Sequence, residues 1–134
     1  MYNTFMQKDF PRWHQLKARI DTPDTQHLYY EEGQVWWMKI GHNVGSEQNG
    51  SVNTFSRPVV IVRGFSSTIF WGVPLSNTQN RSEYVEPVIV DGLERAANLS
   101  QLRVIDTRRV GTQIGSITTE ELQAIKDKLK TFLS

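Results

Sequence analysis

The chain has 134 residues and a formal net charge of +1, with 15 Lys and Arg against 14 Asp and Glu. A chain of this length is usually one domain, and folding buries roughly two-thirds of its surface, enough for a hydrophobic core without disulfides or metals. It contains no cysteine, which excludes disulfides, zinc–thiolate sites and thiol nucleophiles. Because the charge is nearly balanced, a polyanionic partner would have to bind a local basic patch.

The sequence carries no membrane or export signal. No apolar run approaches the ~18 residues of a membrane span, and the N-terminus lacks the apolar segment of a signal peptide. The sequence therefore predicts a soluble, cytoplasmic protein that contacts no membrane.

Residues 1–30 are predicted to form a helical extension. Asp9 is a suitable N-cap and Pro11 fits the first helical turn, while Trp13, Leu16 and Ile20 fall at helical spacing. We expect this helix to pack on the main domain or on a second subunit; recognition of another partner is the alternative.

Residues 31–134 are predicted to form the main domain, a small β-barrel with a C-terminal helix. Alternating or continuous apolar residues indicate five or six short strands, at residues 34–40, 57–62, 68–75, 83–90, 97–105 and 112–117. The fourth of these contains Pro87, which favours an edge strand or a bulge. Residues 91–95 and 106–109 are predicted turns. The fold class is therefore mainly β, with helices at both ends of the chain.

The C-terminal helix has the clearest local signal. Thr118 and Glu121 have the spacing of a capping box. Beyond them, an apolar stripe with lysines on the other faces is typical of an amphipathic helix, formed by Leu122, Ile125, Leu129 and Phe132.

A polar, glycine-bearing segment at residues 41–56 separates the first two predicted strands. Long loops without secondary structure are uncommon in compact domains and are usually functional or disordered. We therefore interpret this segment, together with the two strands that follow it, as the working surface of the molecule.

The sequence lacks the common catalytic and cofactor motifs. It has no P-loop, no dinucleotide-binding glycine fingerprint, no zinc-protease motif and no serine-hydrolase elbow. The three histidines are too scattered to indicate a metal site, at His14, His27 and His42. We therefore expect no cofactor and no metal.

What remains is a set of arginine, glutamate, serine, asparagine and glutamine residues at loop and strand ends. The planar fork of arginine matches phosphate oxygens, so such a set suits phosphodiester chemistry driven by charge stabilisation. On composition alone, Arg57 could equally form a surface pair with Glu47.

Several motifs occur in the order seen in the PemK/MazF family of toxin ribonucleases. They are G-Q-V-W at 33–36, G-S-E-Q-N-G at 45–50, R-P-V-V-I-V at 57–62, V-P-L-S at 73–76, L-S-Q-L-R-V-I-D at 99–106 with R-R at 108–109, and I-G-S-I at 114–117. The chain resembles this family over about residues 31–134. The resemblance implies an SH3-like barrel, a homodimer, and sequence-selective cleavage of single-stranded messenger RNA. It also implies a cognate antitoxin, with which such toxins bind DNA.

The resemblance also implies roles for individual residues. The catalytic arginine of the family falls on Arg57, its phosphate-binding hydroxyl, usually threonine, on Ser76, and its loop glutamate on Glu47. The implied reaction is attack of the RNA 2′-hydroxyl on the adjacent phosphate, giving a 2′,3′-cyclic phosphate and a 5′-hydroxyl. Further RNA contacts are expected at Gln48, Asn77, Arg81, Arg103 and His42.

Two alternatives remain open from the sequence. One is a non-catalytic barrel of the same superfamily, such as a CcdB-like inhibitor that binds gyrase. That group depends on a Trp-Gly-Ile-type end, whereas this chain ends Phe132-Leu133-Ser134. The other is a repurposed barrel that only binds RNA or protein.

Overall fold

The computed structural model describes residues 10–20, 28–41, 55–77 and 82–134. The elements in chain order are α1 (Phe10–Ile20), β1 (Gln34–Lys39), β2 (Ser56–Gly64), β3 (Ile69–Ser76), β4 (Val85–Val90), β5 (Leu93–Asn98), η1 (Leu99–Gln101), β6 (Arg103–Asp106), η2 (Thr107–Arg109), β7 (Val110–Ser116) and α2 (Thr119–Thr131). None of the helices in this part of the chain is long and apolar enough to cross a membrane.

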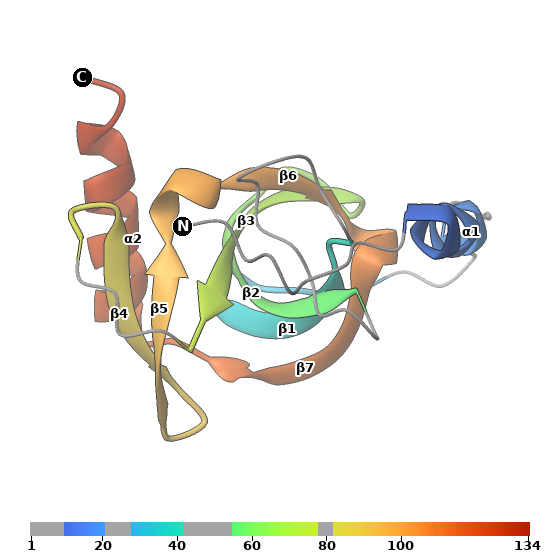
Figure 1. Cartoon of the computed structure of the whole chain (residues 1–134). Coiled ribbons are helices and arrows are strands. Elements are labelled where there is room, and N and C mark those ends of the chain that lie inside the picture. The colour runs from blue at the N-terminus through green and yellow to red at the C-terminus, as the bar shows by residue number, and fades with distance from the viewer. Residues whose placement is uncertain (1–9, 21–27, 42–54, 78–81) are drawn as a thin grey trace.

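The strands form one sheet that curls into a barrel. The hydrogen-bonded order is β4-β5-β3-β2-β1-β7, with β6 also paired to β3. In Figure 1, β1, β2, β3, β6 and β7 wrap around a common axis, whereas β4 and β5 extend towards α2. The predicted fold class, a small SH3-like barrel with a helix at each end, is confirmed. Because β4 lies at the edge of the sheet, the position inferred from Pro87 is correct as well.

The core has two parts. One contains Ile125 of α2 together with valines and other apolar residues of the sheet; Val35, Val60, Val73 and Leu75 are fully buried there. The other fills the barrel interior and is built from Met38, Ile40, Val59, Ile61, Phe70 and Ile105. Residues 59 to 62 of β2 alternate between the two parts, which is why this strand reads as a continuous apolar run.

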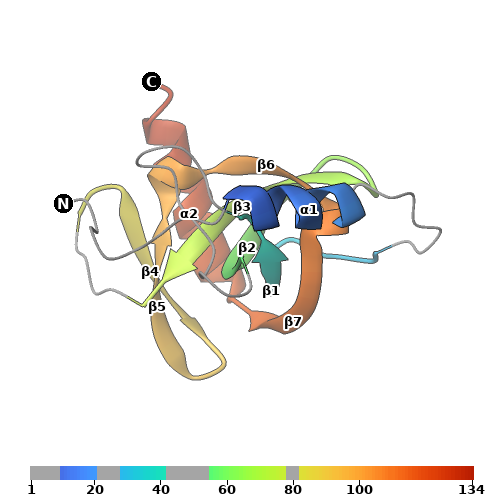
Figure 2. The ribbon, with the colours of Figure 1, turned by 45° about the vertical axis from the view of Figure 1, so that its right-hand side comes forward.

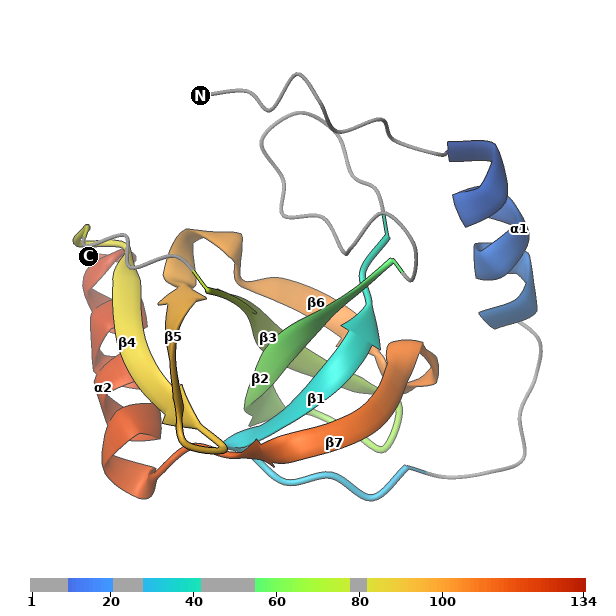
Figure 3. The same ribbon diagram turned by 60° about the horizontal axis from the view of Figure 1, so that its bottom comes forward.

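The helix α2 begins as predicted. The Thr118 hydroxyl accepts a hydrogen bond from the Glu121 backbone N–H at 3.1 Å, and the Glu121 carboxylate accepts from the Thr118 N–H at 2.9 Å. A second oxygen of Glu121 accepts from the Ile89 N–H at 2.8 Å. The capping box therefore also joins α2 to the edge strand β4, and the two lie side by side in Figures 1 and 3.

The structure corrects the prediction of one strand at residues 97–105. Leu75 of β3 pairs with Ala97 of β5, and Trp71 of β3 pairs with Val104 of β6. Four steps along β3 therefore correspond to seven along this segment, so three residues loop out and form η1. The predicted turn at 91–95 was too long for a related reason: only Asp91 and Gly92 turn, and β5 begins at Leu93.

The two tryptophans of β1 differ in their surroundings. Trp36 is partly buried and packs against the barrel interior. Trp37 is 42% exposed. Successive residues of a strand point to opposite faces, and only one face of β1 is fully covered here.

Candidate active site

Arg57 lies near the start of β2 and Ser76 at the end of β3. The antiparallel register pairs Val59 with Pro74, and continuing it by two residues places Arg57 opposite Ser76. The Arg57 Nη1 donates a hydrogen bond to the Leu75 carbonyl at 3.3 Å, directly beside Ser76. Two residues far apart in the sequence are thereby held at one end of the barrel.

Proline residues flank this site on both strands. Pro58 follows Arg57, and Pro74 directly precedes Leu75. Because proline has no backbone N–H, the ladder between β2 and β3 is short of donors here. Here an arginine nitrogen donates to the Leu75 carbonyl.

The guanidinium of Arg57 is partly removed from water. Burial lowers the pKa of Arg57, yet an arginine starts so high that it stays charged at neutral pH. A cation with less water around it attracts an anion more strongly than an exposed one. Fixed position, positive charge and a neighbouring hydroxyl are what stabilisation of a phosphorane-like transition state needs.

The other predicted site residues are placed as follows. Asn77 directly follows Ser76, and its Oδ1 accepts a hydrogen bond from the Arg95 Nη1 at 2.8 Å. Arg103 pairs with Gly72 of β3, four residues from Ser76, or about 13 Å along a strand. The structure therefore does not bring Arg103 next to Arg57. The remaining predicted residues lie outside the described part of the chain: Glu47, Gln48, His42 and Arg81.

The segment that carries Glu47 and Gln48 leaves and re-enters the barrel at a defined neck. The Gly41 N–H donates to the Phe55 carbonyl at 2.9 Å, so the two ends of this segment are joined. Phe55 is 2% exposed and has a positive φ of 58°, which is uncommon for an aromatic residue. Two residues later the chain reaches Arg57.

Helix α1 packs on this neck. The ring of Trp13 lies 5.4 Å from that of Phe55, and the Arg12 guanidinium lies 5.0 Å above the Phe55 ring. A Cβ at Gly41 would come within 2.0 Å of the Trp13 ring, so only glycine fits there. Trp13 is 4% exposed, and α1 lies across one end of the barrel in Figure 2.

Two arginines near these elements were not predicted as site residues. Arg95 was assigned to a turn, but it lies in β5, where its Nε is buried without a hydrogen-bond partner among the described residues. Arg109 donates from Nη1 to the Lys39 carbonyl at 3.2 Å and lies 5.7 Å above the Trp13 ring. Both depend on contacts between distant segments, and the sequence held no local signal for them. In the described part of the chain, no three His, Asp or Glu side chains are grouped so that they could hold a metal.

Comparison with known proteins adds a family and a set of related folds. A sequence model of the family described as "PemK-like, MazF-like toxin of type II toxin-antitoxin system" matches residues 31–133. No curated protein sequence matches the chain.

Solved structures share the fold at low sequence identity. MazF (Form-I) from Deinococcus radiodurans is 16% identical with a TM-score of 0.65, covering 79% of this chain and 97% of that chain. The MazE-MazF structure (Form-II) from the same organism is 14% identical with a TM-score of 0.59, covering 80% of this chain and 97% of that chain. Mycobacterium tuberculosis toxin MazF-mt6 is 14% identical with a TM-score of 0.56, covering 75% of this chain and 95% of that chain. At such identities the likeness concerns the fold.

Proposed function

Because the chain belongs to the PemK-like, MazF-like family of toxins of type II toxin–antitoxin systems, we propose that it is an endoribonuclease that cleaves single-stranded RNA at Arg57 and Ser76. The observation that supports this proposal is the hydrogen bond from the Arg57 guanidinium to the carbonyl of Leu75, the residue directly before Ser76. A charged fork and a hydroxyl in this position suit one phosphodiester.

In the proposed reaction the RNA supplies its own nucleophile. The 2′-oxygen bonds to the adjacent phosphorus, the bond from phosphorus to the 5′-oxygen breaks, and a 2′,3′-cyclic phosphate and a 5′-hydroxyl result. The 2′-hydroxyl loses its proton to the Glu47 carboxylate, and the departing 5′-oxygen takes a proton from water. Arg57 stabilises the charge on the phosphoryl oxygens and Ser76 holds one of them. Arginine itself is a poor proton donor at neutral pH.

The same proposal covers the neighbours of the site. Gln48, Asn77, Arg81, Arg103 and His42 contact the RNA strand outside the scissile phosphate. Residues 31–134 form the catalytic barrel, and residues 1–30 form an extension of it. The protein acts as a homodimer, and a cognate antitoxin neutralises it; the MazE-MazF structure with a similar fold supports an antitoxin as a partner.

The test is to incubate the purified protein with a mixed-sequence single-stranded RNA in the presence of EDTA and to map the new ends. We expect cleavage without added metal, with cyclic phosphates and 5′-hydroxyl ends, because the charge stabiliser is an arginine and no metal is needed for it. An Arg57→Ala preparation, purified in parallel, controls for contaminating nucleases. Cleavage that stops with EDTA and returns with magnesium would contradict the mechanism, and no cleavage of any RNA would favour the non-catalytic barrel.

A further inference from the structure

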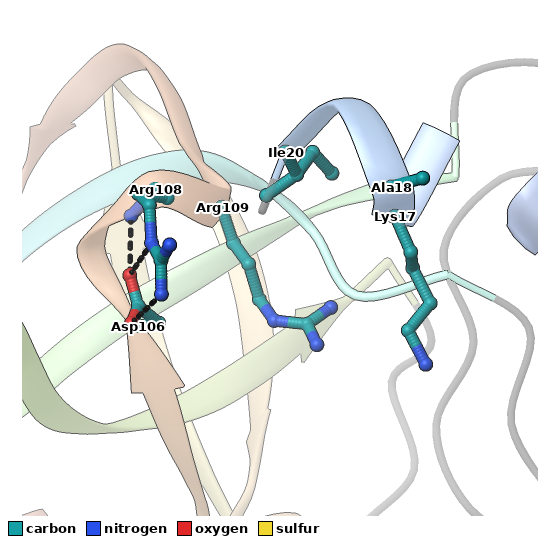
Figure 4. A pocket seen from close by; sticks show the side chains of 6 residues that line it. All are labelled: Lys17, Ala18, Ile20, Asp106, Arg108 and Arg109. Carbon is teal, nitrogen blue, oxygen red and sulfur yellow. Dashed lines mark hydrogen bonds and ion pairs between the residues drawn. The ribbon is translucent and has the colours of Figure 1, made fainter. Parts of the chain in front are cut away.

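A second basic site lies between the N-terminal helix and the barrel. A cavity of about 260 Å³ is lined by Lys17, Ala18 and Ile20 of α1 and by Asp106, Arg108 and Arg109 at the end of β6 and in η2. Figure 4 shows the Arg109 guanidinium extending from η2 towards α1, and the Lys17 side chain extending from α1 to the same side. We refer to it below as the α1–η2 pocket.

The charges that line the pocket are unbalanced. The carboxylate of Asp106 is the only acidic group among the described lining residues, and it is engaged by Arg108, whose Nε and Nη2 each donate to it at 3.0 Å. That pairing holds the pKa of Asp106 below its usual range. Asp106 and Arg108 therefore offset each other, and the other charged residues in the described lining are the cations Lys17 and Arg109.

Arg109 is held rigidly in this position. Its Nη1 donates to the Lys39 carbonyl at 3.2 Å, and its guanidinium lies 5.7 Å above the Trp13 ring. The Lys17 ammonium lies 5.9 Å above the same ring. Both cations therefore lie near the same indole, and a bound anion would offset their positive charge.

The pocket lies close to the candidate active site. Met38 of β1 pairs with Arg57 on one side and with Val110, the residue after Arg109, on the other. The two outer strands are therefore two inter-strand spacings apart, about 10 Å. Helix α1, which supplies Lys17 to the pocket, contacts through Trp13 the ring of Phe55, two residues before Arg57. Figures 2 and 3 show α1 beside the barrel.

We propose that the α1–η2 pocket binds a phosphate of the RNA strand, adjacent along the chain to the phosphate held by Arg57. This inference rests on the proposed ribonuclease function. The pocket is smaller than the roughly 300–1,000 Å³ of a site for a drug-sized molecule, which suits a compact anionic group. A base would need an exposed aromatic face for stacking, whereas Trp13 is 4% exposed. The site therefore contributes affinity and strand position, and not base recognition.

Because Lys17 belongs to α1, this phosphate site exists only in a chain with the N-terminal helix. The family model begins at residue 31, so the contact is supplied from outside the matched region. Helix α1 thereby becomes part of the RNA-binding surface.

The test measures binding separately from cleavage. The probe is a pool of mixed-sequence 2′-deoxy oligonucleotides, which lack the 2′-hydroxyl and cannot be cut by the proposed reaction. The variant is Lys17→Ala, with Arg19→Ala as the matched control, since Arg19 is an exposed cation of the same helix outside the pocket lining. Affinity is measured over a series of salt concentrations between about 50 and 200 mM, where phosphate contacts weaken steeply.

We expect Lys17→Ala to weaken binding about fivefold near the middle of that range and to reduce the log–log salt slope by about 0.7, the value for one phosphate of a single strand. Lys17→Glu should reduce the affinity and the salt slope further. Arg19→Ala should leave the affinity and the slope equal to the wild-type values within error. In a ¹⁵N-labelled protein, the Arg109 Nε–H resonance should shift when the oligonucleotide pool is added to wild type, and less in Lys17→Glu.

An unchanged salt slope in both Lys17 variants would overturn the proposal. So would a slope that falls equally in Arg19→Ala, because the effect would then be a general one of net charge. If Lys17→Glu instead abolishes binding of polyglutamate and leaves oligonucleotide binding intact, the pocket belongs to an acidic peptide and the RNA assignment is wrong. A reduced slope in a protein that cleaves no RNA would support the pocket and contradict the nuclease.

Discussion

At the scale of single residues, Arg57 is the side chain whose role can be tested most sharply. It is charged and partly buried, and it is anchored at Leu75 through one nitrogen, in a position where the guanidinium can face a phosphate. The sequence identified Arg57 and Ser76 through family motifs. It did not indicate the anchor, because residues 57 and 75 meet only when β2 and β3 pair.

We predict that Arg57→Ala lowers turnover of single-stranded RNA by about 10²–10³-fold, the effect of removing one preorganised charge stabiliser. Binding of a non-cleavable strand should fall far less, since one phosphate contact among several is lost. Arg57→Lys should restore only part of the rate, because a point charge cannot reproduce the two-pronged contact. Single-turnover cleavage and fluorescence anisotropy measure the two quantities. Equal losses in both would mean that Arg57 only docks the RNA, and an unfolded variant would mean that it is a structural residue.

At the scale of elements, the contact between α1 and the barrel depends on one glycine. Gly41 has a φ of +71°, and a Cβ there would lie 2.0 Å from the Trp13 ring. Gly92, in the β4–β5 turn, has a φ of +77°, and a Cβ at this position would meet nothing within 4 Å. An alanine at either position would carry the same backbone strain, roughly 1–2 kcal/mol. Only the alanine at Gly41 would also clash with a side chain.

We therefore predict that Gly41→Ala lowers the free energy of unfolding by about 1–3 kcal/mol more than Gly92→Ala does, the range for an overpacked site. Urea denaturation measures the difference. Adding Trp13→Ala to each variant should remove the excess at Gly41, because the clashing ring is gone. If the excess persists in the double variant, α1 does not pack on Gly41 as described.

A second link between elements depends on pH. The Glu32 carboxylate accepts from the Lys126 ammonium of α2 at 2.8 Å and from the Gly64 N–H at 3.1 Å. Burial alone would raise the pKa of Glu32, but these hydrogen bonds, together with the positive charges of Lys126 and Arg63, lower it overall. Since the folded pKa lies below the unfolded value, the ionised carboxylate stabilises the fold above the unfolded pKa. That stabilisation is lost as the pH falls through the folded pKa.

Glu32→Gln should accordingly lower the free energy of unfolding at neutral pH by up to about 1 kcal/mol, the scale of a partly exposed ion pair. The deficit should shrink as the pH falls below about 4. Glu94→Gln, at an exposed position of β5, is the control and should show little change at either pH. Urea titrations at neutral pH and at about one pH unit below the ordinary glutamate pKa decide the matter. A deficit of the same size at both pH values would rule out the ionised carboxylate as its source.

At the scale of the whole molecule, the described surface leaves apolar residues side by side on the sheet. Trp71 of β3 is 43% exposed and pairs with Val104 of β6, which is 57% exposed; Phe65, 53% exposed, contacts Trp71 edge-on. Contiguous apolar surface of this kind marks interaction sites. We predict a two-fold symmetric homodimer, seen by light scattering as twice the 15.4 kDa chain mass. A monomer at micromolar concentration would contradict the prediction.

The sequence predicted those features of the molecule that are determined by residues close together in the chain. The capping box of α2 and the apolar run of β2 each lie within a few neighbouring residues, and both were placed correctly. The division of residues 97–105 into β5, η1 and β6 follows from two registers on the same partner, β3, and alternation along the segment could not indicate it. The same holds for the contact between Arg109 and Trp13, which joins two segments from opposite ends of the chain.

The neck formed by Gly41 and Phe55 also bears on how this protein can change over evolutionary time. The hydrogen bond between Gly41 and Phe55 joins the two ends of residues 42–54. The position of Arg57 therefore does not depend on how many residues lie between Gly41 and Phe55. Doubling the length of a closed loop costs only about 0.6 kcal/mol in chain entropy. Insertions in this segment are therefore nearly free for the fold, so the length and composition of the segment can diverge while Arg57 and Ser76 stay fixed.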